Sequence, residues 1–595
     1  MRRRFIKTGK KLVCMALAAS MMISLAACGS KSDTKNETVA TDNRITNQTN
    51  AIVQTTSQSL EATECYEEVV AESEIDMDKG MAFDSAVKGG AMNDMECVVP
   101  YYDGDYCEEQ NFNTNEYNDV AENSWMSVKT SPLSTFAADV DTASYSELRS
   151  YILNGYGEIP ASMVRIEEMI NYFHYDYERP TGDDRFAVYT EYADCPWNKD
   201  TKLALISLST EEIDFSEAPA SNLVFLIDTS GSMFDSNKLP LVQQSLCMLA
   251  ENLTEKDRIS IVTYAGSDEV VLEGVTGDNY YEISKAIENL EAYGSTNGSA
   301  GINTAYEIAE KYYIKGGNNR VILATDGDLN VGVTSEGELE KLITDKKKSN
   351  VFLSVLGVGY GNFKDNKLET LADKGNGNYA YIDSIFEAKR ALVDDMGANL
   401  LTVAKDVKLQ VEFNPAQVKN YRLIGYENRT MAAEDFNDDT KDGGEMGAGH
   451  SVTALYEIAL ADSDFESQEI ELKYSGNEAS EDNEAVEKKL DSYGDELFTV
   501  SVRYKEPDRD VSKLESYVCK SSNYNKKGSD NLRWAAAVAG FGLLLKDSQY
   551  KGSCDAEMVL TIANTVADSK LDDYKSEFIS LVEQYYCGEV RYLED

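Results

Sequence analysis

The sequence predicts an α/β fold: a doubly wound, Rossmann-like sheet inserted into a β-sandwich, with helical segments flanking both. Three observations support this prediction. Between residues 222 and 400, short apolar runs alternate with stretches of helical length. On both sides of this region, segments alternate apolar and polar residues with period two, as half-buried antiparallel strands do. Residues 531–546 form an apolar stretch of helical length, rich in Ala and Leu.

The first residues predict export from the cytoplasm. Three arginines and three lysines within residues 2–11 precede the apolar run 12–27, which is too short for a lasting membrane span. The run ends in L-A-A-C-G at residues 25–29, which resembles the bacterial lipobox. That resemblance implies a lipoprotein signal peptide at 1–27 and a lipid anchor, of the palmitate type, on Cys28 at the outer face of the cell membrane. A plain secreted protein is the alternative.

Residues 28–122 are rich in Ser, Thr, Asn, Asp and Glu, and we expect a flexible acidic stalk there. The chain has 56 Lys and Arg against 104 Asp and Glu, a net charge of −48. This balance argues against nucleic-acid binding and against membrane contact other than through the anchor. Export permits a disulfide between Cys97 and Cys107, but their pairing stays open. Cys247 is expected to be a buried small hydrophobe.

Residues 123–183 predict two short helices with a strand, and the segment 184–221 predicts strands of the sandwich. Asp139 and Asp141 stand ahead of a helix, where helix capping is favoured over a second cation site. His174 lies among aromatic residues and predicts partly buried packing.

Three loops of the predicted α/β domain carry oxygen-bearing side chains. The apolar run 223–227 predicts a buried strand and leads directly into D-T-S-G-S at 228–232. In open α/β sheets, ligands bind at the carboxyl ends of the strands. A Gly-rich loop at 294–301 and the T-D-G-D stretch at 325–328, which follows the apolar run 321–324, supply further oxygens. Oxygen side chains without Cys or His suit Mg²⁺ or Ca²⁺ rather than zinc.

Taken together, these loops resemble the metal-ion-dependent adhesion site of von Willebrand factor type A (VWA) domains. By that resemblance, the metal residues are Asp228, Ser230, Ser232, Thr296 and Asp326. It implies a Mg²⁺ ion with one open position that accepts an Asp or Glu carboxylate from a protein partner; Mn²⁺ and Ca²⁺ are alternative ions. The alternative reading of the residues is that Asp228 caps the following helix and the serines serve the turn.

The VWA-like domain is expected at residues 222–400. Its strands are predicted at 223–227, 259–264, 270–272, 321–324, 352–358 and 379–382. Its helices are predicted at 238–253, 280–291, 300–314, 336–348, 366–373 and 384–399. This alternation gives a parallel sheet with one antiparallel edge.

Residues 401–510 are expected to continue the β-sandwich, and residues 511–595 to form a helical carboxyl-terminal region. Strands are predicted at 186–191, 203–209, 407–413, 453–458, 470–474 and 497–504. Helices are predicted at 531–546, 555–567 and 571–586. The loop 434–445 holds many acids without EF-hand spacing, and a solvated loop is favoured over a Ca²⁺ site.

Further stretches resemble the YfbK-like group of bacterial VWA proteins. They are residues 131–145, 164–173, 421–429 and 447–456. With the metal motif, the resemblance spans about residues 125 to 590 in the same domain order. It implies an architecture more than a biochemical activity.

The sequence thus predicts a surface-anchored lipoprotein, not an enzyme, that binds a protein partner through a Mg²⁺-bridged acidic ligand, as in cell adhesion. The alternative is an assembly or scaffold factor of the cell envelope. A metal-dependent hydrolase has the least support. The only histidines, His174 and His450, lie in no Ser-His-Asp motif, and the loops 228–232, 294–301 and 325–328 contain neither His nor Glu.

Overall fold

The computed structural model describes most of the chain beyond residue 120. The described residues are 117, 121–138, 141–182, 184–212, 218–294, 298–327, 336–360, 364–395, 397, 399, 401–466, 493–507, 509, 511–566 and 570–594. Several predicted features lie outside them: the signal peptide, Cys28, Cys97, Cys107, Thr296, the strand at 470–474 and nearly all of the stalk.

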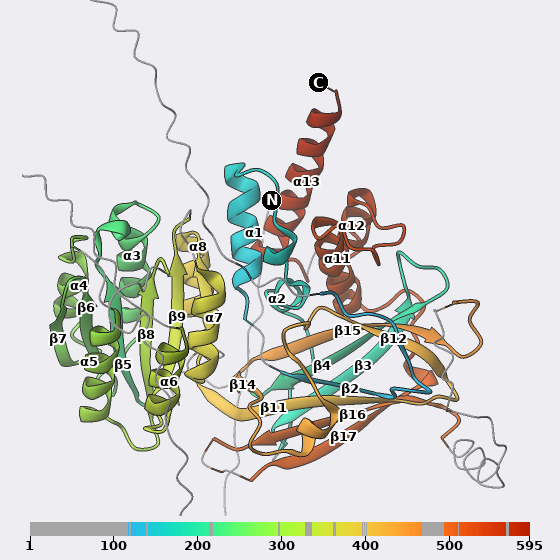
Figure 1. Cartoon of the computed structure of the whole chain (residues 1–595), viewed down its shortest axis with the longest axis horizontal. Coiled ribbons are helices and arrows are strands. Elements are labelled where there is room, and N and C mark those ends of the chain that lie inside the picture. Colours follow the sequence, from blue (N-terminus) through green and yellow to red (C-terminus); the bar gives the residue numbers. More distant parts are fainter. Residues whose placement is uncertain are drawn as a thin grey trace, which may run out of the picture. The chain divides into compact units, whose positions relative to one another are not determined.

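A six-stranded sheet forms the centre of the α/β domain, in the order β10-β9-β8-β5-β6-β7 (Figure 1). The strands are β5 Ser221–Asp228, β6 Arg258–Tyr264, β7 Asp268–Thr276, β8 Asn318–Thr325, β9 Phe352–Val358 and β10 Tyr379–Ile382. Neighbouring strands are parallel except β7, which pairs with β6 in the antiparallel sense. The predicted parallel sheet with one antiparallel edge is confirmed.

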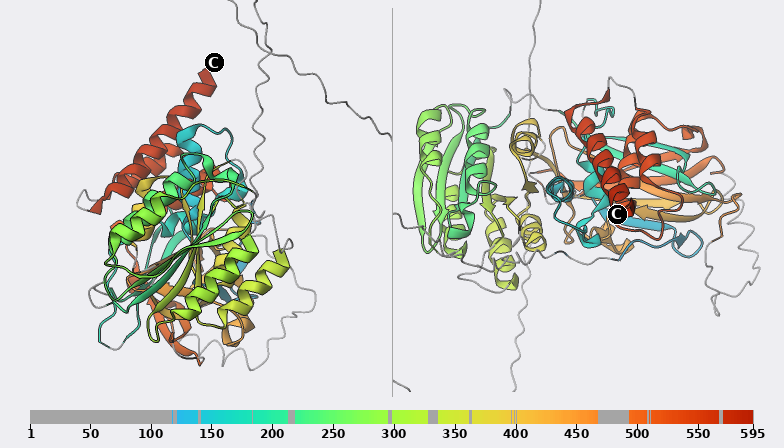
Figure 2. Two further views of the ribbon diagram at one scale, coloured as in Figure 1. Left: turned by 90° about the vertical axis from the view of Figure 1, so that its left-hand side faces the viewer. Right: turned by 90° about the horizontal axis from the view of Figure 1, so that it is seen from above.

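Helices cover both faces of this sheet (Figure 2). One face carries α3 Leu239–Ala250, α4 Tyr280–Glu288 and α8 Ile385–Lys389; the other carries α5 Gly298–Lys311, α6 Glu336–Lys347 and α7 Asp365–Lys374. Phe225 and Leu226 are adjacent in β5 and belong to the cores on opposite faces. Every residue of β5 is therefore buried. The helix predicted at 384–399 differs: α8 passes into a π-helical turn, Arg390–Asp394.

Two antiparallel sheets lie on a second core. The first has the order β1-β12-β15-β4-β3, with β1 Met126–Ser127, β3 Phe186–Asp194, β4 Lys202–Thr210, β12 Val418–Ile424 and β15 Ser451–Leu460. The second has the order β13-β2-β11-β16-β17, with β2 Leu133–Ala137, β11 Thr402–Phe413, β13 Thr430–Met431, β16 Glu496–Lys505 and β17 Lys513–Lys520, and β14 Gly444–Gly447 also pairs with β11. Ile206, Val411 and Tyr456 belong to one buried cluster between them. Each sheet takes strands from both sides of the α/β domain, so this domain is inserted into a β-sandwich, as predicted.

Helices from distant parts of the chain share a third core. They are α1 Ala143–Asn154, η1 Ala161–Met163, α2 Ile166–Asn171, α11 Asp530–Leu545, α12 Ala556–Ala563 and α13 Asp573–Glu594. Phe173, Trp534 and Phe578 meet at steep angles, with ring centroids 5.3 to 5.5 Å apart. No helix within the described residues is both long and apolar enough to cross a membrane.

Four cysteines whose side chains the structure describes form no disulfide. Cys195, Cys247, Cys519 and Cys554 are free thiols. Cys247 was expected to be buried, but it is a half-buried residue of α3 at the edge of the core. Burial raises the pKa of its thiol to about 11, so the reactive thiolate is scarce at neutral pH.

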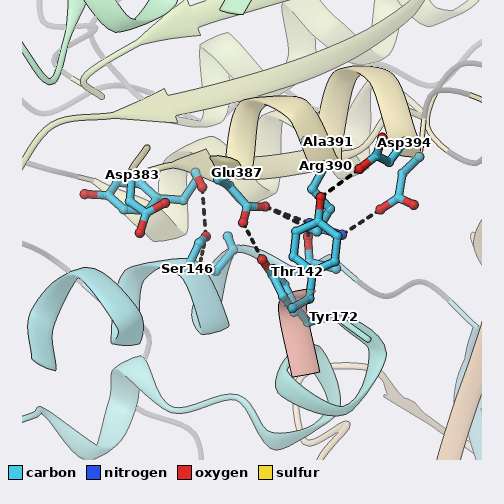
Figure 3. A network of polar contacts seen from close by, with 12 residues as sticks. Thr142, Ser146, Tyr172, Asp383, Glu387, Arg390, Ala391 and Asp394 are labelled. Atoms are coloured by element: carbon cyan, nitrogen blue, oxygen red, sulfur yellow. Dashed lines mark hydrogen bonds and ion pairs between the residues drawn. The ribbon is translucent and has the colours of Figure 1, made fainter. Parts of the chain in front are cut away.

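A buried ionic network connects α1 with α8 (Figure 3). Arg149 of α1 pairs with Asp383 and with Glu387, the latter with 2.9 Å between Nη2 and Oε2. Tyr172 donates a hydrogen bond of 2.7 Å to Glu387 Oε2, and Arg390 Nε donates one of 2.9 Å to Oε1. Burial alone would raise the pKa of Glu387, but Arg390 and Arg149 hold it below its ordinary value. The carboxylate therefore stays ionised inside the protein.

We expect Arg149→Met to lower the free energy of unfolding by about 3–5 kcal/mol, because Asp383 and Glu387 would lose a buried cation. Urea denaturation followed by circular dichroism measures this loss. Lys389→Met is the matched control, since Lys389 and Asp394 form a partly exposed pair at 2.7 Å. The loss in free energy of unfolding of Lys389→Met should stay below about 1 kcal/mol. Equal small losses in both variants would contradict a structural role for the network.

Candidate metal centre

The carboxyl end of β5 places Asp228 where three loops meet. Asp228 is the last residue of β5 and lies opposite Tyr264 of β6 in the register of the sheet. Backbone hydrogen bonds connect the loops: Thr229 N–H donates to Tyr264 O at 3.0 Å, and Gly231 N–H donates to Gly294 O at 3.1 Å. The D-T-S-G-S turn is thereby held against the start of the Gly-rich loop.

The carboxylate of Asp228 is fully buried and hydrogen-bonded at both oxygens. Oδ1 accepts the backbone N–H of Ser230 at 2.9 Å. Oδ2 accepts the hydroxyls of Tyr264 at 3.2 Å and Thr325 at 3.0 Å. Burial raises the pKa of Asp228 to about 6, against the opposing effect of the Ser230 hydrogen bonds. These hydrogen bonds come from the turn and from neighbouring strands, and not from the start of α3, as helix capping would require. They fix the orientation of the carboxylate.

The hydroxyls of Ser230 and Ser232 converge beside this carboxylate. Their Oγ atoms are 3.1 Å apart. Ser230 is buried, whereas Ser232, on the short helix η2 Gly231–Phe234, is exposed. The pair thus runs from the interior of the domain to its surface, as an ion site with one side open to a partner requires.

Asp326 follows β8 and is 2% exposed. Lys238, the residue before α3, donates from Nζ to Asp326 Oδ2 at 3.0 Å and to the carbonyl oxygen of Ser232 at 2.9 Å. Sequence reasoning missed Lys238, which it treated only as the start of a helix. A lysine six residues after a polar turn gives no local sign that its ammonium group folds back onto that turn.

Four of the five predicted metal residues therefore lie at the carboxyl ends of β5 and β8, and Thr296 lies outside the described residues. Within the described part of the chain, no three His, Cys, Asp or Glu side chains are grouped to hold a metal ion. The predicted site offers only two carboxylates and relies on hydroxyl oxygens for the rest. Such an all-oxygen donor set fits Mg²⁺, Mn²⁺ or Ca²⁺.

Two large aromatic side chains stand exposed on the loops of this site. Phe234, two residues after Ser232, is 78% exposed, whereas Met233 before it is completely buried. Tyr293 is 60% exposed, and its backbone N–H donates to Thr229 O at 2.7 Å. Exposed aromatic side chains beside a polar centre are typical of protein interfaces.

The acidic loop 434–445 contains the short helix η4 Ala433–Asn437 and pairs its acids with basic side chains. Arg503 pairs with Asp439 at 3.1 Å, whereas the ammonium group of Lys408 donates to the backbone carbonyl oxygen of Asp438 at 2.7 Å. Lys347 pairs with Asp442 at 3.2 Å. The carboxylates of Asp439 and Asp442 thus lie against separate cations, an arrangement that favours a solvated loop over a Ca²⁺ site.

The capping prediction for Asp141 is wrong, and Asp139 lies outside the described residues. Asp141 accepts the backbone N–H of Tyr379 at 2.9 Å and pairs with Arg429 at 3.0 Å. The residue that caps α1 is Thr142, without a side-chain hydrogen bond. Asp141 thus links the amino-terminal region to β10 and to the sandwich.

The two histidines of the chain line the same cavity of about 90 Å³. His174 was expected to be partly buried; its side chain is 57% exposed, and its Nε2 lies 2.7 Å from Asp395 Oδ1. His450 has a buried Nδ1 without a hydrogen-bond partner in the described structure. Burial lowers the pKa of His450 to about 4.

Comparison with known proteins matches three family models to this chain. The von Willebrand factor type A domain matches residues 222–395, a model described as von Willebrand factor matches 111–205, and one described as uncharacterized protein YfbK, C-terminal, matches 398–586. The uncharacterized protein YfbK of Escherichia coli (strain K12) is 40% identical over 485 residues, which cover 80% of each protein. Inter-alpha-trypsin inhibitor heavy chain H4 of Sus scrofa is 25% identical over 37% of this chain and 22% of its own length.

Solved structures with a similar fold include a von Willebrand factor type A protein from Catenulispora acidiphila. It is 14% identical, with a TM-score of 0.37, and the match covers 64% of this chain and 87% of that one. Proximal thread matrix protein 1 from the mussel byssus, with a zinc-occupied MIDAS motif, is 20% identical with a TM-score of 0.26 over 32% of this chain and 46% of that one.

We expect His174→Gln to lower stability only at acidic pH. The hydrogen bond and charge of Asp395 raise the pKa of His174 above its ordinary value of 6.5. The pair therefore stabilises the fold fully below about pH 6.5, and this contribution is lost as pH rises through the folded-state pKa. Urea unfolding should show a loss of up to about 1 kcal/mol near pH 5.5, and almost none near pH 9.

His450→Gln is the matched control with the opposite trend. Because burial lowers the folded-state pKa of His450 to about 4, only the unfolded chain takes up this proton below about pH 6.5. Removing His450 should thus raise stability, relative to the natural protein, as pH falls from 6.5 toward 4. A parallel pH trend in the two variants would contradict the assigned roles.

Proposed function

Because the chain belongs to the YfbK-like family of bacterial VWA-domain proteins, we propose that it binds a protein partner through a Mg²⁺ ion at the end of its parallel sheet. VWA domains commonly mediate protein–protein interaction through a metal-ion-dependent adhesion site. Asp228, Ser230, Ser232 and Asp326 would hold the ion, together with Thr296. When bound, the ion would supply an electrophilic position for an Asp or Glu carboxylate of the partner.

The observation that carries this proposal is that hydrogen bonds already hold the oxygen donors in place before an ion binds. Asp228 is fixed by hydrogen bonds from Ser230, Tyr264 and Thr325, and the Ser230 and Ser232 hydroxyls already lie 3.1 Å apart. Little conformational entropy is then lost when an ion binds. Structural capping alone would not require two convergent hydroxyls that end at the surface.

The surface around the site supports a protein partner rather than a small molecule. Phe234 and Tyr293 would add apolar contact beside the metal-bridged carboxylate, because both side chains are largely exposed. A net charge of −48 disfavours nucleic acid as the partner. The proposed action is binding and not catalysis, since these loops contain neither a His nor a Glu that could act as a base at the ion.

An assembly or scaffold role in the cell envelope is the second candidate. The insertion of the VWA domain into a sandwich with further helices provides additional surfaces for other proteins. Both candidates use the same metal site and differ in the identity of the partner. A hydrolase that uses the metal as a Lewis acid would need a base that these loops do not supply.

We expect Asp228→Ala to weaken Mg²⁺ binding by about tenfold or more, because it removes one of two carboxylates of the site. Isothermal titration calorimetry of the full chain measures this affinity. Asp278→Ala is the matched control: Asp278 is exposed and lies beyond β7, so its loss should leave Mg²⁺ binding unchanged. Equal Mg²⁺ affinity of the natural protein and Asp228→Ala would refute the metal assignment.

Crosslinking in intact cells compares the natural protein with Asp228→Ala in their capture of the partner. Capture of the partner should require divalent cations and should be lost both with a chelator and in Asp228→Ala. An adhesion partner would come from another cell or matrix, whereas an assembly partner would be a protein of the same envelope. Capture that is equal with and without chelator would contradict a metal-bridged contact.

We also propose that Cys28 carries a lipid anchor that holds the protein at the outer face of the cell membrane. Cys28→Ser should therefore move the protein from the membrane fraction to the soluble fraction of cells. Cell fractionation with immunoblotting measures this shift, with Cys97→Ser as the control that keeps the anchor. Unchanged membrane association of Cys28→Ser would show that no lipid on Cys28 is needed.

A further inference from the structure

Lys238 brings a positive charge into the candidate metal centre. Its Nζ lies 3.0 Å from Asp326 Oδ2 and 2.9 Å from the carbonyl oxygen of Ser232. The residue is 8% exposed, so water screens its charge only weakly. Both acceptors belong to the loops of the site: Asp326 is a metal residue, and Ser232 supplies a hydroxyl to it.

The backbone around Lys238 is shaped to admit its long side chain. Gly359, directly after β9, has a φ of +82°, and a Cβ atom there would lie 2.4 Å from Lys238 Cε and 2.9 Å from Cγ. Any other residue at 359 would displace the lysine stem or the backbone. The inward orientation of the Lys238 side chain thus depends on a glycine at position 359, 121 residues further along the chain.

Including Lys238 changes the net charge of the site from −2 to −1. Asp228 and Asp326 contribute two negative charges, and Lys238 contributes one positive charge. A divalent ion bound by two carboxylates alone would be neutralised. With Lys238 the same ion leaves a net charge of +1 in a poorly screened environment. The affinity of oxygen sites for divalent ions follows the charge of their ligands.

We propose that Lys238 is a counter-charge that weakens metal binding and leaves the bound ion electrophilic toward the carboxylate of a partner. This inference rests on the proposed function, since it concerns the same ion. Lys238 is a positioning and charge-setting residue and not a metal ligand, because an ammonium group has no free electron pair. The alternative role, in which Lys238 only holds Asp326 in place for the ion, predicts the opposite effect of its removal.

The test is calorimetric titration of the full chain with Mn²⁺ alone. We expect Lys238→Met to bind Mn²⁺ about tenfold more tightly than the natural protein, because the like charge is gone. Lys238→Gln should tighten binding similarly, since it keeps a donor for Asp326 without the charge. Lys285→Met is the matched control: Lys285 of α4 pairs with Glu288 at the surface, so its removal should not change the affinity.

A second measurement compares thermal unfolding with and without Mn²⁺. Without metal, Asp228 and Asp326 repel each other in Lys238→Met, so this variant should unfold earlier than the natural protein. With metal, its unfolding temperature should rise by more than that of the natural protein. If Lys238→Met does not fold without metal, Lys238→Gln gives the same comparison.

The outcomes separate the two proposals. If neither the natural protein nor the Lys238 variants bind Mn²⁺, the metal site itself is wrong. If the natural protein binds Mn²⁺ but the variants bind it equally or more weakly, the metal site stands and the counter-charge role of Lys238 is overturned. Tighter binding in Lys238→Met but not in Lys238→Gln would show that the hydrogen bond matters and not the charge, which also overturns this role.

Discussion

The parallel register of β5 with its two neighbours is the constraint on which the site depends. Asp228 is paired with Tyr264 on one side, and Ile227 with Ala324 on the other, so Thr325 comes next to Asp228. Parallel strands end at the same edge, which is why both hydroxyls reach one carboxylate oxygen. A shift of one residue in either pairing would turn these side chains to the opposite face.

The sandwich places a second constraint on the α/β domain. The chain leaves the first sheet of the sandwich before this domain and enters the second sheet after it. β4 belongs to the first sheet and β11 to the second, and the whole α/β domain lies between them in sequence. The two ends of the inserted domain must therefore meet the sandwich at fixed points. Arg429, directly before β13, pairs with Glu369 of α7 at 2.9 Å, and Arg149 of α1 pairs with Glu387 of α8 at 2.9 Å. These buried ion pairs connect the α/β domain to the sandwich and to the helical region.

Local patterns in the sequence predicted the parallel sheet and the oxygen-rich turn, because an apolar run followed by Asp228 is a short-range signal. Thr296 was predicted in the same way and remains a prediction. What failed depends on long-range contacts. Lys238 meets Asp326 across 88 residues and Asp141 meets Tyr379 across 238, so no local pattern reveals either. β17 escaped prediction because this edge strand is largely exposed and carries few buried apolar residues.

The position of Lys238 in the candidate metal centre can be explained by the acidity of the chain as a whole. A net charge of −48 raises the concentration of divalent cations near the protein, so the site need not bind its ion tightly to be filled. What limits capture of an acidic partner is repulsion from that same negative surface. A bound ion fully neutralised by Asp228 and Asp326 would do little against this repulsion at short range. The charge of Lys238 leaves the ion partly unneutralised, and thereby makes the metal an attractive point for a carboxylate on this surface.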